Sequence, residues 1–173
     1  VGNIDHFRGE ADLAATSYAR AIPADDPVWA STLAWRSGAC WLLGRNDEAK
    51  QLALQAHEAA HALKSDRALA TAHTALAMVA LKDGDWRANG LHYQQALRAA
   101  ERAGDLLQRC RVLANLGSRH IENGEYSLGL EYTNQAITLA EPCGFAMVAA
   151  LARCNRAEVW LRTGVIDAAG HAA

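Results

Sequence analysis

LANLGSRHIENGEYSLGLEYTNQAITL, residues 113–139, predicts two helices joined by a turn at Gly124. Small residues occur in both helices at set distances from that turn. Gly117 lies seven residues before it, and Gly129 and Ala136 lie five and twelve residues after it. Two antiparallel helices approach closely only where the facing side chains are small. We therefore expect these positions to face each other across the helix pair.

The same spacing of small residues recurs along the whole chain. Turn glycines follow one another at intervals of 35, 40, 40 and 40 residues: Gly9, Gly44, Gly84, Gly124 and Gly164. Seven residues before each turn the residue is always small: Gly2, Ser37, Ala77, Gly117 and Ala157. Twelve residues after the first four turns it is alanine: Ala21, Ala56, Ala96 and Ala136. Five residues after the turns, only Asn89 interrupts a small series: Ala14, Ala49, Gly129 and Ala169. A constant period of this size indicates stacked helical repeats.

The unit built on Leu116-Gly117, Gly124, Tyr126 and Ala136 resembles the tetratricopeptide repeat (TPR), and the resemblance covers nearly the whole chain. It implies an all-α fold, a right-handed superhelix of antiparallel helix pairs. Two features depart from the family pattern. The period is 40 residues instead of the usual 34 or so, which predicts longer helices, and the proline that ends each repeat is absent except for Pro142.

The repeat frame predicts one helical-repeat domain over residues 1–173, expected to be a fragment of a longer protein. Its parts are a partial repeat at 1–22, repeats at 27–64, 66–103 and 105–142, and a partial repeat at 145–173. Each unit leaves an apolar face that the next unit covers. Larger side chains, such as Trp86, Leu116 and Tyr126, are expected to fill the spaces between units. Asp26 before Pro27 predicts a helix start.

Composition narrows the classes of function. The chain is 51% hydrophobic and 21% charged with a net charge of −2, which argues against a surface that binds nucleic acid or anionic lipid. No apolar run approaches the roughly 18 residues that a membrane span needs. The four cysteines form no C-x-x-C pair, which indicates reduced thiols and a cytoplasmic protein.

His57-Glu58-Ala59-Ala60-His61 matches the H-E-x-x-H signature of zinc peptidases. Histidines four residues apart on a helix can reach one Zn²⁺, but a catalytic site needs a third protein ligand. None follows at the expected downstream spacing, and Lys50 and Lys64 are expected on the same side of the helix. We therefore expect surface histidines, no bound metal or other cofactor, and no catalysis; a zinc peptidase is the remote alternative.

The TPR resemblance also implies a concave face lined by the first helix of each pair. Residues in the columns that face this groove are the candidate partner-binding residues: Trp35, Trp41, Arg111, Asn115, Ser118, Asn155, Glu158 and Arg162. An asparagine amide both donates and accepts, so Asn115 and Asn155 suit an extended peptide backbone. Glu122 and Glu158 on the same face would repel the phosphates of DNA. The expected partner is a protein, a peptide or another domain of the same chain.

The 40-residue unit resembles the helical arrays of bacterial LuxR-type, MalT-like transcriptional regulators. This resemblance implies a sensor or interaction region whose DNA-binding part lies elsewhere. Two alternatives remain open: a general protein-interaction scaffold unrelated to transcription, and a peptide-signal receptor array.

Overall fold

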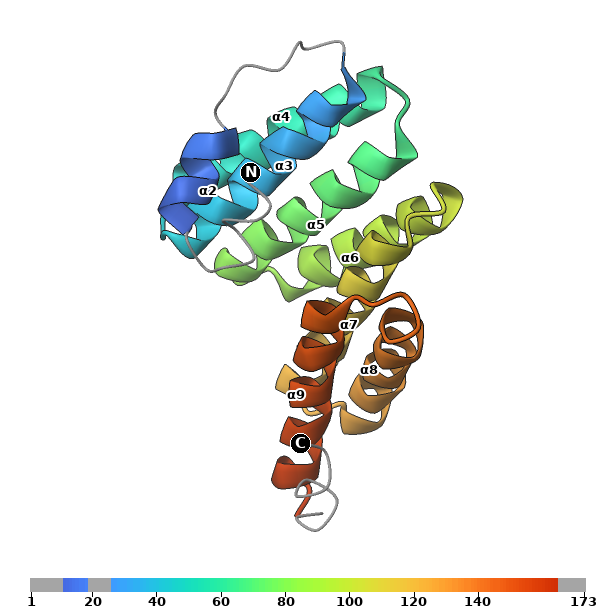
Figure 1. Ribbon diagram of the computed structural model, residues 1–173. Coiled ribbons are helices and arrows are strands. Elements are labelled where there is room, and N and C mark those ends of the chain that lie inside the picture. Colours follow the sequence, from blue (N-terminus) through green and yellow to red (C-terminus); the bar gives the residue numbers. More distant parts are fainter. Residues whose placement is uncertain (1–10, 19–25, 165–173) are drawn as a thin grey trace. The chain divides into compact units, whose positions relative to one another are not determined.

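The computed structural model describes residues 11–18 and 26–164, and each regular element in these ranges is an α-helix (Figure 1). The helices are α2 (Ala11–Tyr18), α3 (Pro27–Leu42), α4 (Asn46–Ala62), α5 (Asp66–Lys82), α6 (Trp86–Arg102), α7 (Leu106–Glu122), α8 (Tyr126–Ala140) and α9 (Ala146–Arg162). The all-α prediction is confirmed, and from α3 onward the expected helix pairs are present. Parts of the two predicted partial repeats, at 1–10, 19–22 and 165–173, lie outside the described residues. Within the described ranges, no helix combines the length and apolar character needed to span a bilayer.

A residue with positive φ ends each helix from α3 to α9, and these residues recur every 20 positions. Six are glycines (Gly44, Gly84, Gly104, Gly124, Gly144 and Gly164), and the seventh is Lys64, with φ 50°. At Gly124, the glycine N–H donates to the Ile121 carbonyl (3.0 Å) and the next N–H, of Glu125, donates to His120 (2.8 Å). This pair of hydrogen bonds requires a residue in the left-handed conformation, which glycine adopts without steric cost. The turns between pairs are therefore equivalent to the turns within pairs.

Short polar side chains begin several of the helices. Asp26 accepts from the Val28 N–H at 2.8 Å, as the sequence predicts, and Asp85 accepts from the Ala88 N–H at 2.8 Å. Asp105 caps α7 in the same way through the Gln108 N–H. Each of these bonds satisfies a backbone donor that has no partner within the helix.

The predicted facing positions meet in all three complete helix pairs. Ser37 Oγ donates to the Ala49 carbonyl at 2.7 Å, and Asn89 Nδ2 donates to the Ala77 carbonyl at 2.8 Å. In α7 and α8, a methyl group added to Gly117 would lie 3.3 Å from the Gly129 carbonyl oxygen. Asn89 thus interrupts the small series because its amide binds the backbone of the facing helix. The alanines twelve residues after the turns, in α4, α6 and α8, are completely buried.

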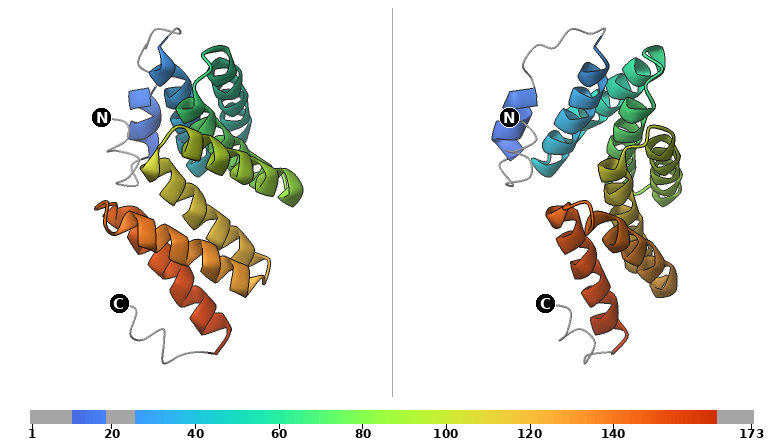
Figure 2. Two further views of the ribbon diagram at one scale, coloured as in Figure 1. Left: turned by 90° about the vertical axis from the view of Figure 1, so that its right-hand side faces the viewer. Right: turned by 45° about the vertical axis from the view of Figure 1, so that its right-hand side comes forward.

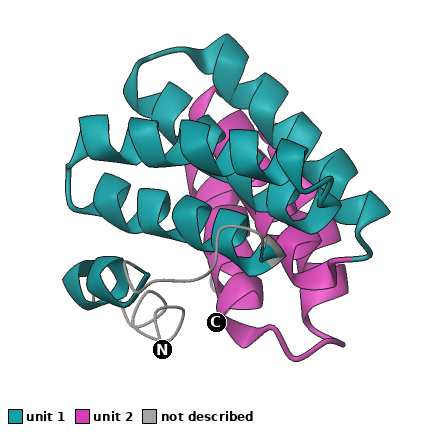
Figure 3. Ribbon diagram, turned by 90° about the horizontal axis from the view of Figure 1, so that it is seen from above, with its two compact units in different colours: residues 1–104 teal, residues 105–173 magenta. Residues whose placement is uncertain are grey.

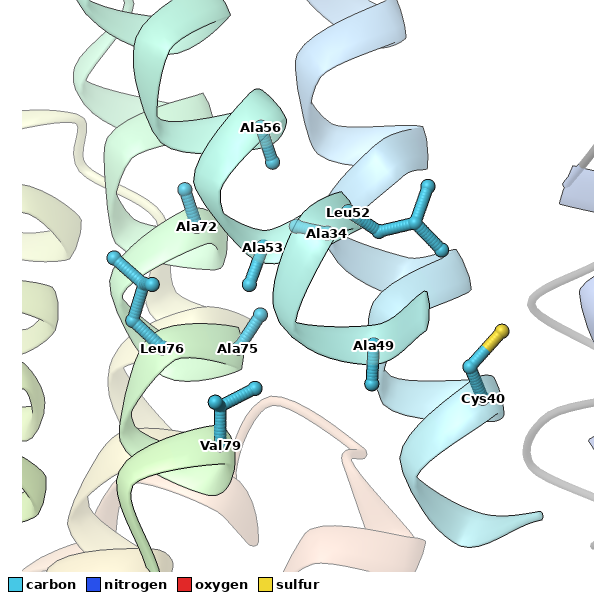
Figure 4. Close-up of a cluster of buried hydrophobic side chains, with 10 residues drawn as sticks. All are labelled: Ala34, Cys40, Ala49, Leu52, Ala53, Ala56, Ala72, Ala75, Leu76 and Val79. Atoms are coloured by element: carbon cyan, nitrogen blue, oxygen red, sulfur yellow. The ribbon is translucent and has the colours of Figure 1, made fainter. Parts of the chain in front are cut away.

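Two compact units divide the chain, residues 1–104 and 105–173 (Figure 3). In the first unit, α3, α4 and α5 pack together and α6 packs on α5, while α2 lies against α3 (Figures 1 and 2). A cluster of small and branched side chains fills the space between α3, α4 and α5: Ala34, Cys40, Ala49, Leu52, Ala53, Ala56, Ala72, Ala75, Leu76 and Val79 (Figure 4).

In the second unit, α8 packs on α7, and α9 contacts both. Leu116 and Ile121 of α7 and Val159 of α9 are almost fully buried. Leu116 is 1% exposed, which is consistent with its predicted packing role, whereas Trp86 in the first unit is 40% exposed.

Candidate functional site

The two candidate tryptophans lie on α3 in the first unit. Trp35 stacks on Tyr18 of α2, with ring centroids 6.5 Å apart and planes at 22°. Trp41 is partly buried and packs against the core cluster, and its buried Nε1 has no hydrogen-bond partner. Much of both rings is therefore used in packing helices together.

The strongest candidate partner-binding face lies on α7 in the second unit. Arg111, Asn115 and Ser118 follow one another at spacings of four and three residues, so they share one side of the helix. All three side chains are partly exposed, whereas the core residues Val112, Leu113 and Leu116 beside them are buried. We call Arg111, Asn115 and Ser118 the α7 polar face.

The three candidates on α9 are engaged within the protein. Asn155 is 7% exposed, and its Nδ2 donates to the Ala114 carbonyl of α7 at 3.1 Å. Arg162 pairs with Glu158 at 2.6 Å, and hydrogen bonds to Tyr126 and then to Glu158 raise the pKa of its guanidinium. The Asn155 amide therefore serves to join α7 to α9, a role that differs from the one expected of it in the groove.

The H-E-x-x-H motif lies beside two histidines from other helices. His57 and His61 are T-shaped neighbours on α4, with centroids 4.5 Å apart, and His57 lies 4.8 Å from His73 of α5. His73 stacks on His92 of α6, and their Nδ1 atoms are 3.3 Å apart. We call these four residues the histidine cluster. Repeat packing therefore brings four imidazoles together, a grouping that the sequence did not predict, while His61 itself is exposed as expected.

The histidine cluster lines a pocket of about 550 Å³ in the first unit. The remaining lining residues come from α5 and α6: Leu69, Leu91, Gln95, Arg98, Ala99 and Arg102. Burial, followed by the neighbouring histidines, lowers the pKa of His73 to about 4. Burial also lowers the pKa of His57 and of His92. A lowered pKa favours the neutral form of these three imidazoles, whose unprotonated nitrogens can act as hydrogen-bond acceptors or metal ligands.

Lys50, which was expected on the same side of α4 as the histidines, is engaged in an ion pair. Its ammonium pairs with Asp83 at 2.8 Å, and this bond raises the pKa of the lysine. Sequence reasoning missed His73 and His92 because it searched for further ligands only downstream of His61 at family spacings. The available signal was their position: His73 lies sixteen residues after His57, and His92 lies nineteen after His73, which places each on the next helix of a 20-residue period.

Neither a protein-family model nor a curated protein sequence matches the chain. Among solved structures, the chain is similar to a signal transduction ATPase with numerous domains (STAND) that has a tetratricopeptide repeat sensor, from Pyrococcus horikoshii. The TM-score is 0.74 at 15% identity, over 99% of this chain and 27% of that one. The chain is also similar to BtubC (BKLC) from P. vanneervenii, with a TM-score of 0.70 and 16% identity over 99% of this chain and 74% of that one. At these identities the similarity concerns the fold, which is a TPR-like array of stacked helix pairs.

Proposed function

We propose that the chain is a protein- or peptide-binding helical-repeat module with no catalytic role of its own, serving as the sensor or interaction region of a larger regulator. The observation that carries this proposal is the α7 polar face, a row of partly exposed hydrogen-bonding side chains on a helix whose opposite side is buried and apolar. Because the helix already restricts these side chains, little conformational entropy is lost when a partner binds them.

The chemistry of the α7 polar face suits an extended acidic segment. The Asn115 amide can donate to one backbone carbonyl and accept from one N–H of the same peptide. Arg111, whose Nη1 is buried, can pair with a carboxylate through the rest of its guanidinium. Ser118 adds a donor and acceptor one turn further along. DNA is a poor partner, since Glu122 follows Ser118 on the same helix and would repel phosphates.

A bacterial LuxR/MalT-like transcriptional regulator is the full-length context that we favour. The 40-residue unit supports it, as does the sensor description of the P. horikoshii STAND protein, which shares the fold. A nucleotide-binding loop and a helix-turn-helix elsewhere in the gene would support this context. Their absence would favour a general scaffold or a peptide-signal receptor array, the two alternatives.

Peptide selection tests the binding role directly. Peptides selected from a random display library on the immobilised chain are synthesised, and their dissociation constants are measured by fluorescence anisotropy. Asn115→Ala and Arg111→Ala should each weaken binding about tenfold, the loss of one charged or paired hydrogen bond of about 1.5 kcal/mol. Gln135→Ala, an exposed amide on α8, is the matched control and should leave binding unchanged.

Two results would count against the proposal. Selection that yields no saturable binder would argue against a peptide-binding module. Binders that are insensitive to both α7 variants, while circular dichroism shows each variant folded, would move the binding surface elsewhere. Asn155→Ala is unsuitable as a binding variant, because it removes a bond between α7 and α9.

A further inference from the structure

Three successive helices of the first unit contribute to the histidine cluster. His57 and His61 come from α4, His73 from α5 and His92 from α6, and each ring lies within 5.5 Å of the next, centroid to centroid. Hydrophobic packing alone does not favour such a group, because each imidazole carries two polar nitrogens that must be satisfied. The Nδ1 atoms of His73 and His92 lie within hydrogen-bonding distance of each other, and Gln95 also bonds to His92.

The distance between two of these nitrogens matches a coordination geometry. Zn–N bonds of about 2.0–2.1 Å at a tetrahedral angle place two ligand nitrogens about 3.3–3.4 Å apart. The Nδ1 atoms of His73 and His92 are 3.3 Å apart. One proton shared between the two nitrogens also fits this distance, so the pair is arranged for either a proton or a metal ion.

We propose that the histidine cluster binds one divalent transition-metal ion, with His73 and His92 as the first two ligands and His57 as the third. In the described part of the chain, no group of three or more His, Cys, Asp or Glu side chains is arranged so that it could hold a metal ion. Coordination therefore requires the His57 ring to turn toward the other two. The space for that rotation is the pocket itself, which His57 lines and which holds about 550 Å³. His61, one helical turn from His57 and exposed, can supply a fourth nitrogen.

The charges around the histidine cluster permit a bound cation. Arg102 lines the same pocket, but its guanidinium is paired with Asp66 at 2.6 Å. Burial lowers the pKa of both His57 and His92; Glu58 acts in the opposite direction on His57, and a hydrogen bond to Gln95 and then Asp85 do so on His92, which places a negative charge near each of these rings. Arg98 is the opposing positive charge and acts on His73. The negative charges of Glu58 and Asp85 therefore offset the positive charge of Arg98 near the histidine cluster.

The donor set selects the kind of ion. Neutral imidazole nitrogens favour Zn²⁺, Ni²⁺ and Cu²⁺, whereas Mg²⁺ and Ca²⁺ prefer carboxylate and carbonyl oxygens. A metal ion held by α4, α5 and α6 would link three helices of the first unit, so its binding free energy would add to the stability of that unit. The proposed role is structural or regulatory, and it does not require Glu58 to act as a base.

Titration of the untagged, metal-free chain with ZnCl₂ tests the proposal by isothermal calorimetry and thermal unfolding. We expect one Zn²⁺ per chain and a higher melting temperature, with no effect of MgCl₂. His92→Ala and His57→Ala should each weaken Zn²⁺ affinity at least tenfold. His73→Gln should also weaken Zn²⁺ affinity. Glutamine is used at this buried position because its side chain fills more of the space left by the imidazole than alanine would. The control is His120→Ala in the second unit, where the ring stacks on Tyr132 and bonds to Glu125.

Several outcomes would overturn the proposal. These are the absence of saturable Zn²⁺ binding, unchanged affinity in both His57→Ala and His92→Ala, or an equal loss in His120→Ala. Cys143 and Cys154 are exposed thiols that could also bind zinc. If Zn²⁺ binding disappears in Cys143→Ser or Cys154→Ser and persists in His92→Ala, the site lies at the cysteines and the histidine proposal is wrong. Circular dichroism of each metal-free variant separates lost ligands from lost folding.

Discussion

Replacement of Gly117 by alanine tests the packing of α7 on α8. The added methyl carbon would lie 2.4 Å from Thr133 Oγ1 and 3.3 Å from both the Gly129 carbonyl oxygen and the Thr133 nitrogen. The first distance is an overlap that requires movement. Thr133 is completely buried, so its side chain has no solvent to move into, and the two other contacts are with backbone.

The expected magnitude combines two opposing effects. Alanine in a helix interior is more stable than glycine by about 0.5–1 kcal/mol. Overpacking of a closely packed interface costs about 1–3 kcal/mol. We expect Gly117→Ala to lower the free energy of unfolding by about 1–2 kcal/mol net. For a chain of this size, each kcal/mol corresponds to about 2–4 °C in melting temperature.

Urea unfolding followed by circular dichroism measures the change, and a double-mutant cycle with Thr133→Ala locates its cause. Thr133→Ala removes the atom that the new methyl group overlaps, so the double variant should lose less stability than the two single variants together, by about 1 kcal/mol or more. Gly117→Ala at or above wild-type stability would refute the close approach of α7 and α8. Additivity of the two changes within about 0.5 kcal/mol would refute Thr133 as the obstacle.

Three further substitutions test the turns and the contacts between helices, all by urea unfolding. Lys64→Gly should raise stability by about 0.5–1 kcal/mol, because relief of a left-handed lysine (φ 50°) outweighs the entropy cost of glycine; a loss would show that Lys64 is not strained. Asn155→Ala should lower stability by about 1 kcal/mol, the net value of a buried hydrogen bond, and unchanged stability would return Asn155 to the candidate binding residues. Ala136→Leu at a fully buried position should cost about 1–3 kcal/mol, and an unchanged unfolding curve would contradict the repeat frame.

The repeat architecture was readable from the sequence because it depends on contacts at constant spacing. Gly117 and Gly129 meet across a turn at Gly124, and the equivalent positions of the other pairs meet in the same way. Such contacts lie within one helix pair, so the distance along the chain specifies them. The candidate site was predictable to a smaller extent: Arg111, Asn115 and Ser118 share an accessible helix face, as their spacing required.

Contacts between different helix pairs depended on tertiary structure. Asn155 lies 41 residues from Ala114, and its hydrogen bond depends on how α9 packs on α7. Its position within the repeat therefore could not show whether it binds a partner or packs against another helix. The histidine cluster is the clearest case. His57 and His61 form a recognisable motif on one helix, but His73 and His92 join them only because α5 packs on both α4 and α6. Spacing along the chain determines which side of its own helix a residue occupies, and only the packing of whole helices determines which side chains it meets.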